Sequence, residues 1–377
     1  MNKKIYLSSP HMSGKEMKYI HEAFDTNWVA PLGPNVNEFE NTLQFYLGEN
    51  NFVAALNSGT AGIHLALILA GVSQGDEVFC QSFTFSASAN PILYVGAKPV
   101  FIDSEADTWN MCPKSLEVAI LDRLAKGKNL KAVIVVDSYG MPAKWDQIAA
   151  IAKKYSLFII EDAASALGST YKNQKCGTLG NIGVLSFNGN KIITTSGGGA
   201  LVAKTSEIKE KAVFFATQSR DNAPHYQHSE VGYNYRMSNI VAGIGRGQME
   251  VLNEHIALRR VMHDFYVSYF KDIKGVTVFT EPNSDYYSNH WLSAILVNPE
   301  QTNGKTREDL RLALDAANIE SRPLWKPMHL QPIFANDPYY GGTLSESLFQ
   351  KGLCLPSGSN LDDEDRDRIK AVLDSFF

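Results

Sequence analysis

The lysine at position 191 stands in a setting that favours chemistry. It follows the segment Ser186-Phe-Asn-Gly-Asn190, in which an apolar strand end gives way to turn-forming residues, and it precedes three glycines at 197–199. Glycines allow backbone or a ligand to approach closely. A lysine buried there would have a lowered pKa, and its neutral amine would be free to attack a carbonyl carbon. The alternative is an exposed lysine in a glycine-rich loop, because lysine side chains are mostly exposed.

The segment Asn57-Ser-Gly-Thr-Ala-Gly62 has the composition of a phosphate-binding turn. A short apolar strand is expected before it, at 52–56, and a buried helix after it. Free N–H groups and the dipole of a helix N-terminus attract anions, and the hydroxyls of Ser58 and Thr60 add donors. No Gly-Lys-Ser/Thr follows, so the segment is not a P-loop.

A pair of acids, Glu161 and Asp162, ends another apolar strand. A carboxylate at the end of a buried strand is costly unless it has a partner. A protonated pyridine nitrogen is one such partner, although Asp162 alone has the alternative role of a helix N-cap. Phe85 offers an aromatic face against which a ring can stack. Lysine, acid, phosphate turn and aromatic ring are the groups that pyridoxal phosphate needs from a protein, so we predict this cofactor.

The elements that must position these residues alternate between strand and helix. Runs of apolar and β-branched residues predict strands at 52–56, 77–81, 98–103, 131–137, 157–162, 184–187 and 200–203. With helical segments between them, this order predicts an α/β fold whose mostly parallel sheet carries helices on both faces. Ligand-binding residues should then lie just past the carboxyl ends of strands, as Ser58, Phe85, Asp162 and Ser186 do.

The pattern changes around residues 232–239, after which a helix leads into a longer one, and we place a domain boundary near residue 250. We therefore expect a large domain at 1–249 and a smaller α/β domain at 250–377, which also suits a chain too long for one typical core. The second domain is expected to contain strands at 276–280 and 291–297 and helices at 306–317 and 363–377.

Composition places the chain among ordinary globular proteins. Of its 377 residues, 44% are hydrophobic and 20% are charged, and the net charge of −5 is spread without blocks of like charge. This balance favours neither nucleic acid nor a membrane surface as a partner. No signal peptide is recognisable and the four cysteines are scattered, which predicts a cytoplasmic protein with reduced thiols. His225 and His228 lack a third ligand nearby, so no metal site is expected.

Several short motifs occur together along the whole chain. They are Gly33-Pro34 with Phe39-Glu40, Asn57-Ser-Gly-Thr-Ala61, Thr84-Phe85, Glu161-Asp-Ala-Ala164, Ser186-Phe-Asn-Gly-Asn-Lys191, Gly197-Gly-Gly199 and Gly232-Tyr-Asn-Tyr-Arg236. In these motifs the chain resembles the sugar aminotransferases of the DegT/DnrJ/EryC1/StrS group, which have the fold-type I architecture of pyridoxal phosphate enzymes. The resemblance implies that fold, and a homodimer whose active sites are shared between the subunits.

The resemblance also implies a role for each site residue. Lys191 would bind the cofactor covalently and move the proton, Asp162 would hold the pyridine nitrogen, and Phe85 would stack on the ring. The other expected cofactor contacts are Ser58, Gly59, Thr60, Ser186, Asn188 and, reaching across from the second subunit, Asn234. Ser165 stands where many members carry Gln or His near the ring, which leaves open the contact to the 3-hydroxyl or the ring face.

Two loops are expected to meet the substrate. The first contains Trp28, Pro31 and Gly33 and follows a helix expected at 13–24, and its alternative role is that of a plain connector. The second, at 322–329, supplies a cation, a stacking surface and hydrogen-bonding groups that suit a nucleotide diphosphate. These groups belong to Arg322, Trp325, Lys326 and His329. A loop merely pinned by its two prolines is the alternative.

The lysine motif and the loop at 322–329 are most similar to one branch of the family, which aminates UDP-linked 4-keto-6-deoxy-N-acetylhexosamines, as in bacillosamine biosynthesis. We therefore expect transfer of an amino group from L-glutamate, the usual donor in the family, to C4 of such a sugar, for surface glycans. The alternatives are a C3 or C4 keto-sugar on GDP or dTDP and a non-catalytic regulator. A dehydratase is disfavoured because members with that chemistry commonly replace the lysine with histidine.

Overall fold

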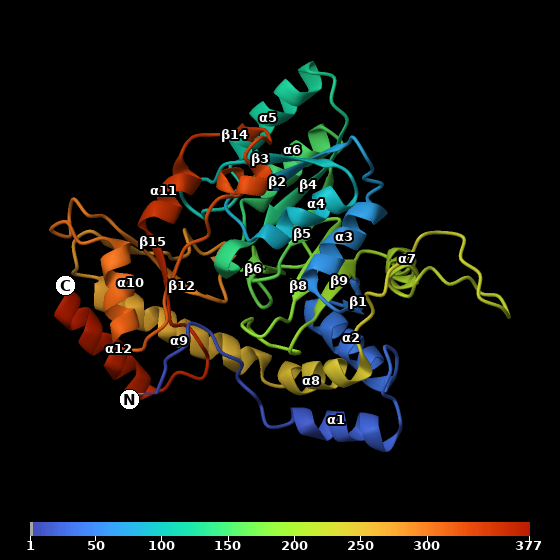
Figure 1. Ribbon diagram of the computed structural model, residues 1–377, viewed down its shortest axis with the longest axis horizontal. Coiled ribbons are helices and arrows are strands. Elements are labelled where there is room, and N and C mark those ends of the chain that lie inside the picture. Colours follow the sequence, from blue (N-terminus) through green and yellow to red (C-terminus); the bar gives the residue numbers. More distant parts are fainter. Residues whose placement is uncertain (1–2) are drawn as a thin grey trace.

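The computed structural model describes residues 3–377. Within that range the strands form sheets of eight, four and three strands (Figure 1). The large sheet has the order β1-β9-β8-β5-β4-β2-β3-β14, and only β9 runs antiparallel to its neighbours, so the prediction of a mostly parallel sheet is confirmed. Its strands are β1 (Phe52–Leu56), β2 (Glu77–Gln81), β3 (Lys98–Ile102), β4 (Leu130–Val136), β5 (Phe158–Asp162), β8 (Ile182–Ser186), β9 (Gly199–Ala203) and β14 (Tyr339–Tyr340).

Both faces of the large sheet are buried, which explains why its strands are nearly continuous apolar runs. In β4, Ile134 packs with α3, α4 and α7, whereas Val133 and Val135 face α5 and α6 on the other side. Near β1, that second face is covered by α2. These helices are α2 (Pro34–Leu47), α3 (Gly59–Leu69), α4 (Asn90–Tyr94), α5 (Pro113–Ala125), α6 (Trp145–Lys154) and α7 (Ser206–Ala216).

The carboxyl ends of the strands bring distant parts of the sequence to one edge of the sheet. β5 ends at Asp162, β8 ends at Ser186, and β1 leads directly into α3. In an open α/β sheet the ligand site lies just beyond this edge. The segments predicted to hold the lysine, the acid and the phosphate turn therefore meet there.

The chain beyond residue 250 builds a smaller part around an antiparallel sheet of order β10-β12-β15-β13. Helices α9, α10 and α12 pack on this sheet, and α9 runs from it towards the large part (Figure 1). Helix α8 (Asn239–Met249) precedes this part, whose elements are α9 (Leu252–Phe270), β10 (Val276–Val278), β12 (Ser293–Val297), α10 (Arg307–Ala316), β13 (Arg322–Pro323), α11 (Leu344–Lys351), β15 (Gly352–Leu355) and α12 (Asp363–Phe376).

The two parts of the chain exchange elements. β14 joins the large sheet beside β3, and β11 (Tyr286–Tyr287) pairs with β6 (Thr170–Tyr171), which itself pairs with β7 (Gln174–Lys175). In the opposite direction, Ile5 forms a bridge to Ile319 and packs in the core of the smaller part. The break between α8 and α9 is compatible with our proposed boundary after residue 249.

The first helix, α1 (Glu16–Asp25), begins later than expected and packs along α8. Its apolar residues Met17 and Phe24 do not point into the core but are exposed. Across residues 3–377, no helix is long and apolar enough to cross a membrane.

Candidate active site

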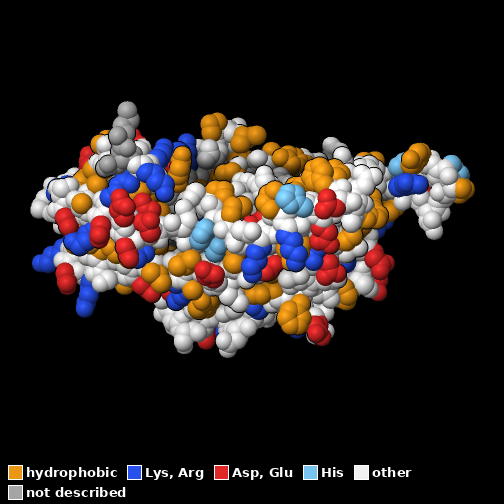
Figure 2. All heavy atoms as spheres, turned by 90° about the horizontal axis from the view of Figure 1, so that it is seen from below, with side chains coloured by type: hydrophobic (Ala, Val, Ile, Leu, Met, Phe, Trp, Pro, Cys, Tyr) orange, Lys and Arg blue, Asp and Glu red, His pale blue; other side chains and the backbone are white. Residues whose placement is uncertain are grey.

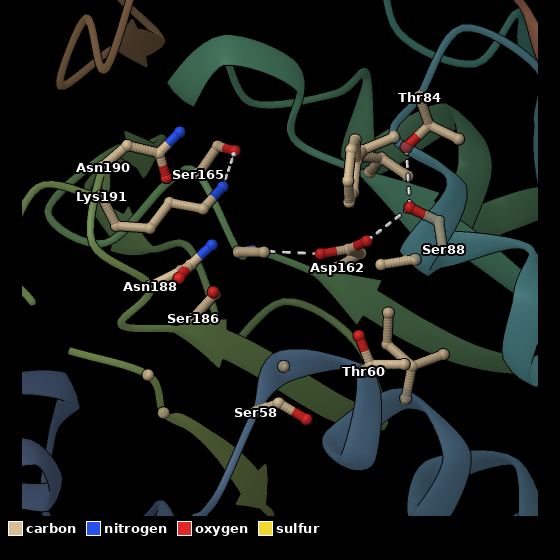
Figure 3. A pocket seen from close by; sticks show the side chains of 18 of the residues that line it. Ser58, Thr60, Thr84, Ser88, Asp162, Ser165, Ser186, Asn188, Asn190 and Lys191 are labelled. Atoms are coloured by element: carbon tan, nitrogen blue, oxygen red, sulfur yellow. Dashed lines mark hydrogen bonds between the residues drawn. The ribbon is translucent and has the colours of Figure 1, made fainter. Parts of the chain in front are cut away.

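A cavity of about 360 Å³ opens at the carboxyl edge of the large sheet. Its walls come from the turn after β1 and from α3, from the turn after β2, from the ends of β4, β5 and β8 and from the turn after β8, with two tryptophans added by the C-terminal part. The residues predicted from the sequence that line it are Ser58, Gly59, Thr60, Phe85, Asp162, Ser165, Ser186, Asn188, Lys191 and Trp325. In Figure 3, Lys191 and Asp162 face the same space from two sides.

Lys191 lies in the turn after β8, and its amine reaches into the cavity. Nζ donates to Oγ of Ser165 at 3.0 Å and lies 3.9 Å from the centre of the Trp291 ring. Burial lowers the pKa of Lys191 to about 8, an effect that the Asp162 carboxylate opposes and the Arg259 guanidinium reinforces. Near neutral pH a far larger fraction of the amine is therefore neutral, and nucleophilic, than in an exposed lysine.

Asp162, the last residue of β5, has a partner on each carboxylate oxygen. Oδ2 accepts a hydrogen bond of 2.6 Å from Ser88, and Oδ1 accepts one of 3.1 Å from the N–H of Ala164. Behind Ser88, the Thr84 hydroxyl lies at 2.7 Å (Figure 3). Burial raises the pKa of Asp162, and the Ser88 hydrogen bond is the first of the contacts that lower it again.

Glu161 points to the other side of the sheet, because successive strand residues face opposite ways. Its carboxylate accepts from the backbone N–H groups of Gly177, Leu179 and Gly180. Burial and the neighbouring Glu161 hold the pKa of Asp137 well above its usual range. Glu161 therefore supports a loop, while Asp162 alone faces the cavity.

The N-terminus of α3 forms an anion-binding cup. Ser58 is its N-cap and accepts from the N–H of Ala61 at 3.1 Å, and Ser58, Thr60 and Ser186 lie on one side of the cavity (Figure 3). Backbone fills the space behind the cup: a Cβ added at Gly199 would lie 2.4 Å from the nitrogen of Gly59. Free N–H groups, hydroxyls and a helix dipole converge here as a phosphate requires.

Phe85 completes the cavity with an aromatic wall, and 60% of its surface is exposed. Amine, carboxylate, cup and ring are together the donor set that pyridoxal phosphate needs, and they occupy one cavity, so the residues present fit this cofactor.

A family model confirms this interpretation of the cavity. The chain matches the DegT/DnrJ/EryC1/StrS aminotransferase family over residues 10–374. The protein belongs to this family. It is therefore a pyridoxal phosphate-dependent sugar aminotransferase, as the motifs predicted.

Relatives in the family cover the whole chain. EpsN of Bacillus subtilis, provisionally named a pyridoxal phosphate-dependent aminotransferase, is 51% identical over 100% of this chain and 97% of its own. GDP-perosamine synthase of Escherichia coli O157:H7 is 35% identical over 100% and 99%. UDP-2-acetamido-2-deoxy-3-oxo-D-glucuronate aminotransferase of Pseudomonas aeruginosa is 32% identical over 81% of each chain.

Solved structures of the family have the same fold. A DegT DnrJ EryC1 StrS aminotransferase from Brucella abortus superposes with a TM-score of 0.88, at 31% identity over 96% of this chain and 95% of that one. Spr1654 of Streptococcus pneumoniae, provisionally named a sugar aminotransferase and solved in its PLP form, has a TM-score of 0.89 at 25% identity, over 100% of both chains. The predicted fold class and cofactor are thus confirmed.

Three of the predicted substrate residues lie in the loop around β13, outside the cavity. Arg322 is exposed and pairs with Glu320 at 2.9 Å, and Lys326 is also exposed. His329 instead packs against protein: its ring stacks on Tyr339, and Nδ1 lies 2.7 Å from the Ser82 hydroxyl. Among the predicted residues of this loop, only Trp325 lines the cavity.

The loop between α1 and α2 and Asn234 also lie outside the cavity of their own chain. Gly33 has a φ of 142°, and a Cβ there would lie 2.6 Å from the side chain of Asn239, so packing alone requires glycine. The carbonyl of Trp28 accepts from Asn239, which ties the loop to α8. Asn234 is held through its carbonyl, which accepts from the side chain of Asn57 at 3.1 Å.

Several residues that support the site were not predicted from the sequence. Trp291 lies beside the lysine amine, and its indole N–H donates to the carbonyl of Asn190 at 2.6 Å. Arg259 of α9 is buried and forms no ion pair within residues 3–377, and it donates to the carbonyls of Lys191 at 3.3 Å and Trp291 at 2.6 Å. The only sequence signal is a tryptophan before an apolar strand and an arginine in a helix, and neither indicates a partner so distant in the chain.

Proposed function

We propose that this aminotransferase moves an amino group from L-glutamate to C4 of a UDP-linked 4-keto-6-deoxy-N-acetylhexosamine. The observation that carries the catalytic part is the pairing, in one cavity, of a lysine whose pKa burial lowers to about 8 with the buried carboxylate of Asp162. The substrate class rests on the resemblance of the lysine motif and the loop at 322–329 to one branch of the family.

In this proposal Lys191 and Asp162 have separate tasks. Bound pyridoxal phosphate supplies an electron-withdrawing ring that carries the amino group between the two substrates. Lys191 would hold the cofactor covalently, and once released its amine, whose pKa burial lowers, would carry a proton between the reacting carbons. Asp162 keeps the pyridine nitrogen protonated, Phe85 stacks on the ring, and the cup at Ser58–Thr60 with Ser186 binds the phosphate.

A second hollow of about 460 Å³ supports a nucleotide-linked substrate. It shares Asn190, Trp291 and Trp325 with the cofactor cavity and extends to Arg322. The tryptophans offer stacking surface, and the guanidinium suits a diphosphate. A bound sugar nucleotide can therefore place its sugar over the cofactor and its nucleotide along this hollow.

The relatives favour testing other nucleotides as well, since one is named for a GDP-sugar and another for a UDP-sugar. The protein, loaded with cofactor and glutamate, should be given UDP-, GDP- and dTDP-linked 4-keto-6-deoxy sugars, with the amino sugar measured by mass spectrometry. We expect the highest kcat/KM with the UDP-linked N-acetyl sugar and none with Lys191→Ala. A preference for a GDP-linked sugar would support the alternative, and no turnover with any sugar would support a regulator.

We also propose a homodimer that shares its active sites. Large apolar side chains are exposed along α1 and the following loop, namely Met17, Phe24, Trp28, Val29 and Leu32. Hydrophobic side chains are visible across the α1 side of the molecule, and an arm protrudes at one end (Figure 2). That arm follows α7 (Figure 1) and exposes Tyr226 and Val231. Exposed apolar surface of this extent is typical of a protein interface.

We propose that the protein is located in the cytoplasm. Its support is the state of the cysteines: Cys80, Cys112, Cys176 and Cys354 are all free thiols, and three of them are buried. Unpaired buried thiols are typical of proteins in reducing compartments.

A further inference from the structure

Two buried hydroxyls stand in line behind the carboxylate of Asp162. We propose that Ser88, supported by Thr84, is a positioning residue that keeps Asp162 oriented and anionic, so that the proton it shares with the pyridine nitrogen stays on the nitrogen. This inference rests on the proposed role of Asp162. Ser88 lies outside the family motifs quoted above, and none of them implies a function for it.

The direction of the hydrogen bonds follows from the chemistry of the groups. An ionised carboxylate can only accept, so the single hydroxyl proton of Ser88 must be the one donated to Oδ2 of Asp162, at 2.6 Å. The contact of 2.7 Å between Thr84 and Ser88 then has only one remaining donor, which is the hydroxyl of Thr84. The chain of hydrogen bonds therefore runs from Thr84 to Ser88 to Asp162, and each hydrogen bond strengthens the one that follows.

Because both hydroxyls are buried, this chain of hydrogen bonds is the principal support of Oδ2 of Asp162. Thr84 and Ser88 are each only 1% exposed, so water does not replace a lost hydroxyl easily. Oδ1 accepts a weaker contact of 3.1 Å from the backbone of Ala164. The rest of the carboxylate faces the cavity, where the ring nitrogen is expected.

One short turn carries both the hydroxyls and the stacking ring. Phe85 stands between Thr84 and the 3₁₀ turn at Ser86–Ser88, and its exposed ring lines the cavity, while Ser88 contacts Asp162 and Thr84 contacts Ser88. The same turn would therefore hold both the carboxylate that is to meet the ring nitrogen and the phenyl group that is to stack on the ring.

The chemical consequence concerns where a shared proton rests. A hydrogen bond donated to a carboxylate stabilises its anionic form and makes it a weaker base. A weaker base leaves the proton on the pyridine nitrogen, which keeps the ring an effective electron sink. Without the Ser88 hydroxyl, the buried carboxylate should draw the proton towards itself and leave the ring more nearly neutral.

The test compares the protonation of the ring nitrogen in variants loaded with pyridoxal phosphate that carries ¹⁵N at that position. In Ser88→Ala, we expect the ¹⁵N resonance to move towards the neutral pyridine value and kcat to fall about tenfold, the effect of losing one hydrogen bond to a charged group. Thr84→Val should change both quantities in the same direction and by less.

Ser345→Ala is the matched control, because Ser345 is also fully buried and donates to a buried carboxylate, that of Asp103, away from the cavity. It should leave the ¹⁵N resonance unchanged. An unchanged resonance in loaded, folded Ser88→Ala, or an equal change in Ser345→Ala, would overturn the inference. The Asp162→Asn variant distinguishes failure of the Ser88 inference from failure of the proposed role of Asp162. If both Ser88→Ala and Asp162→Asn keep the wild-type resonance, the proposed role of Asp162 is wrong. If the resonance changes in Asp162→Asn but not in Ser88→Ala, only the inference about Ser88 is rejected.

Discussion

At the residue scale, the two carboxylates that end β5 have different surroundings because strand residues alternate between faces. Glu161 accepts three backbone N–H groups on one side, and Asp162 faces the cavity on the other. From the sequence, either acid was a candidate partner for the ring nitrogen. The geometry separates a supporting carboxylate from one that is free to meet a ligand.

This separation predicts opposite effects for two similar substitutions. Asp162→Asn should lower kcat by roughly a hundredfold or more, because a neutral amide cannot keep the ring nitrogen protonated. Its melting temperature should change little. Glu161→Gln should instead lower the free energy of unfolding by about 2 kcal/mol, because an amide N–H would face backbone donors. Steady-state kinetics and denaturant unfolding of both variants check this, and similar kcat losses in both would contradict it.

The lowered pKa of Lys191 predicts how its reactivity depends on pH. Below pH 8 the amine of the cofactor-free protein is mostly protonated, and above it mostly neutral, so its acylation rate should rise with a midpoint near pH 8. The unfolded chain, with a pKa near 10.5, holds the proton more strongly, so the cost of burying Lys191 falls as pH rises between these values. Peptide mass spectrometry after brief acylation measures the rate, with exposed Lys114 as an internal reference. A midpoint near 10.5 would contradict the burial argument.

At the scale of elements, the strands were predictable because a doubly covered parallel sheet needs nearly continuous apolar runs. The expected strands at 52–56 and 77–81 coincide with β1 and β2. Helix α5 was not recognised, since exposed apolar residues such as Val118 and Leu121 blur its pattern. Lysine and acid were recognised by type, whereas Ser88 and Asp162 are 74 residues apart, and no local pattern indicates such a contact.

The close packing of β9 against the start of α3 predicts the effect of one methyl group. Gly199→Ala would place a Cβ 2.4 Å from the backbone of Ser58 and Gly59, so the phosphate cup must move. We expect a loss of about 2 kcal/mol in stability and at least about tenfold weaker binding of pyridoxal phosphate. Thermal unfolding and cofactor titration measure these quantities. Gly189→Ala is the control, since its nearest neighbour would lie 3.9 Å away; a wild-type affinity in Gly199→Ala would show that the cup tolerates the shift.

At the scale of the whole molecule, a single chain leaves several predicted contacts away from its own cavity. Asn234 and the loop after α1 both lie outside the cavity of their own chain, although the family resemblance gives both to an active site. The exposed apolar residues of α1 lie next to that loop. A second copy of the chain packed against the α1 side would cover these apolar residues and would allow Asn234 and the loop to contact the active site of that copy.

Subunit mixing tests whether Asn234 acts across the interface. Alone, the Lys191→Ala variant should be inactive and the Asn234→Asp variant weakly active, and the two should be combined under conditions that exchange subunits. In a mixed dimer one site would carry both defects and the other neither, so about a quarter of wild-type activity should return at equal mixing. Native mass spectrometry must demonstrate exchange. No recovery despite exchange would place both residues in the same site of one chain.

The indole ring that lies 3.9 Å from the amine of Lys191 also gives the protein an optical property. Indole emits in the near ultraviolet and violet, where a vitamin B6 aldehyde bound to lysine begins to absorb. Excitation energy should therefore pass from Trp291, and from Trp325 beside it, to whatever chromophore fills the cavity that both line. Intrinsic fluorescence should fall as each molecule is loaded and recover as it empties, without any added dye.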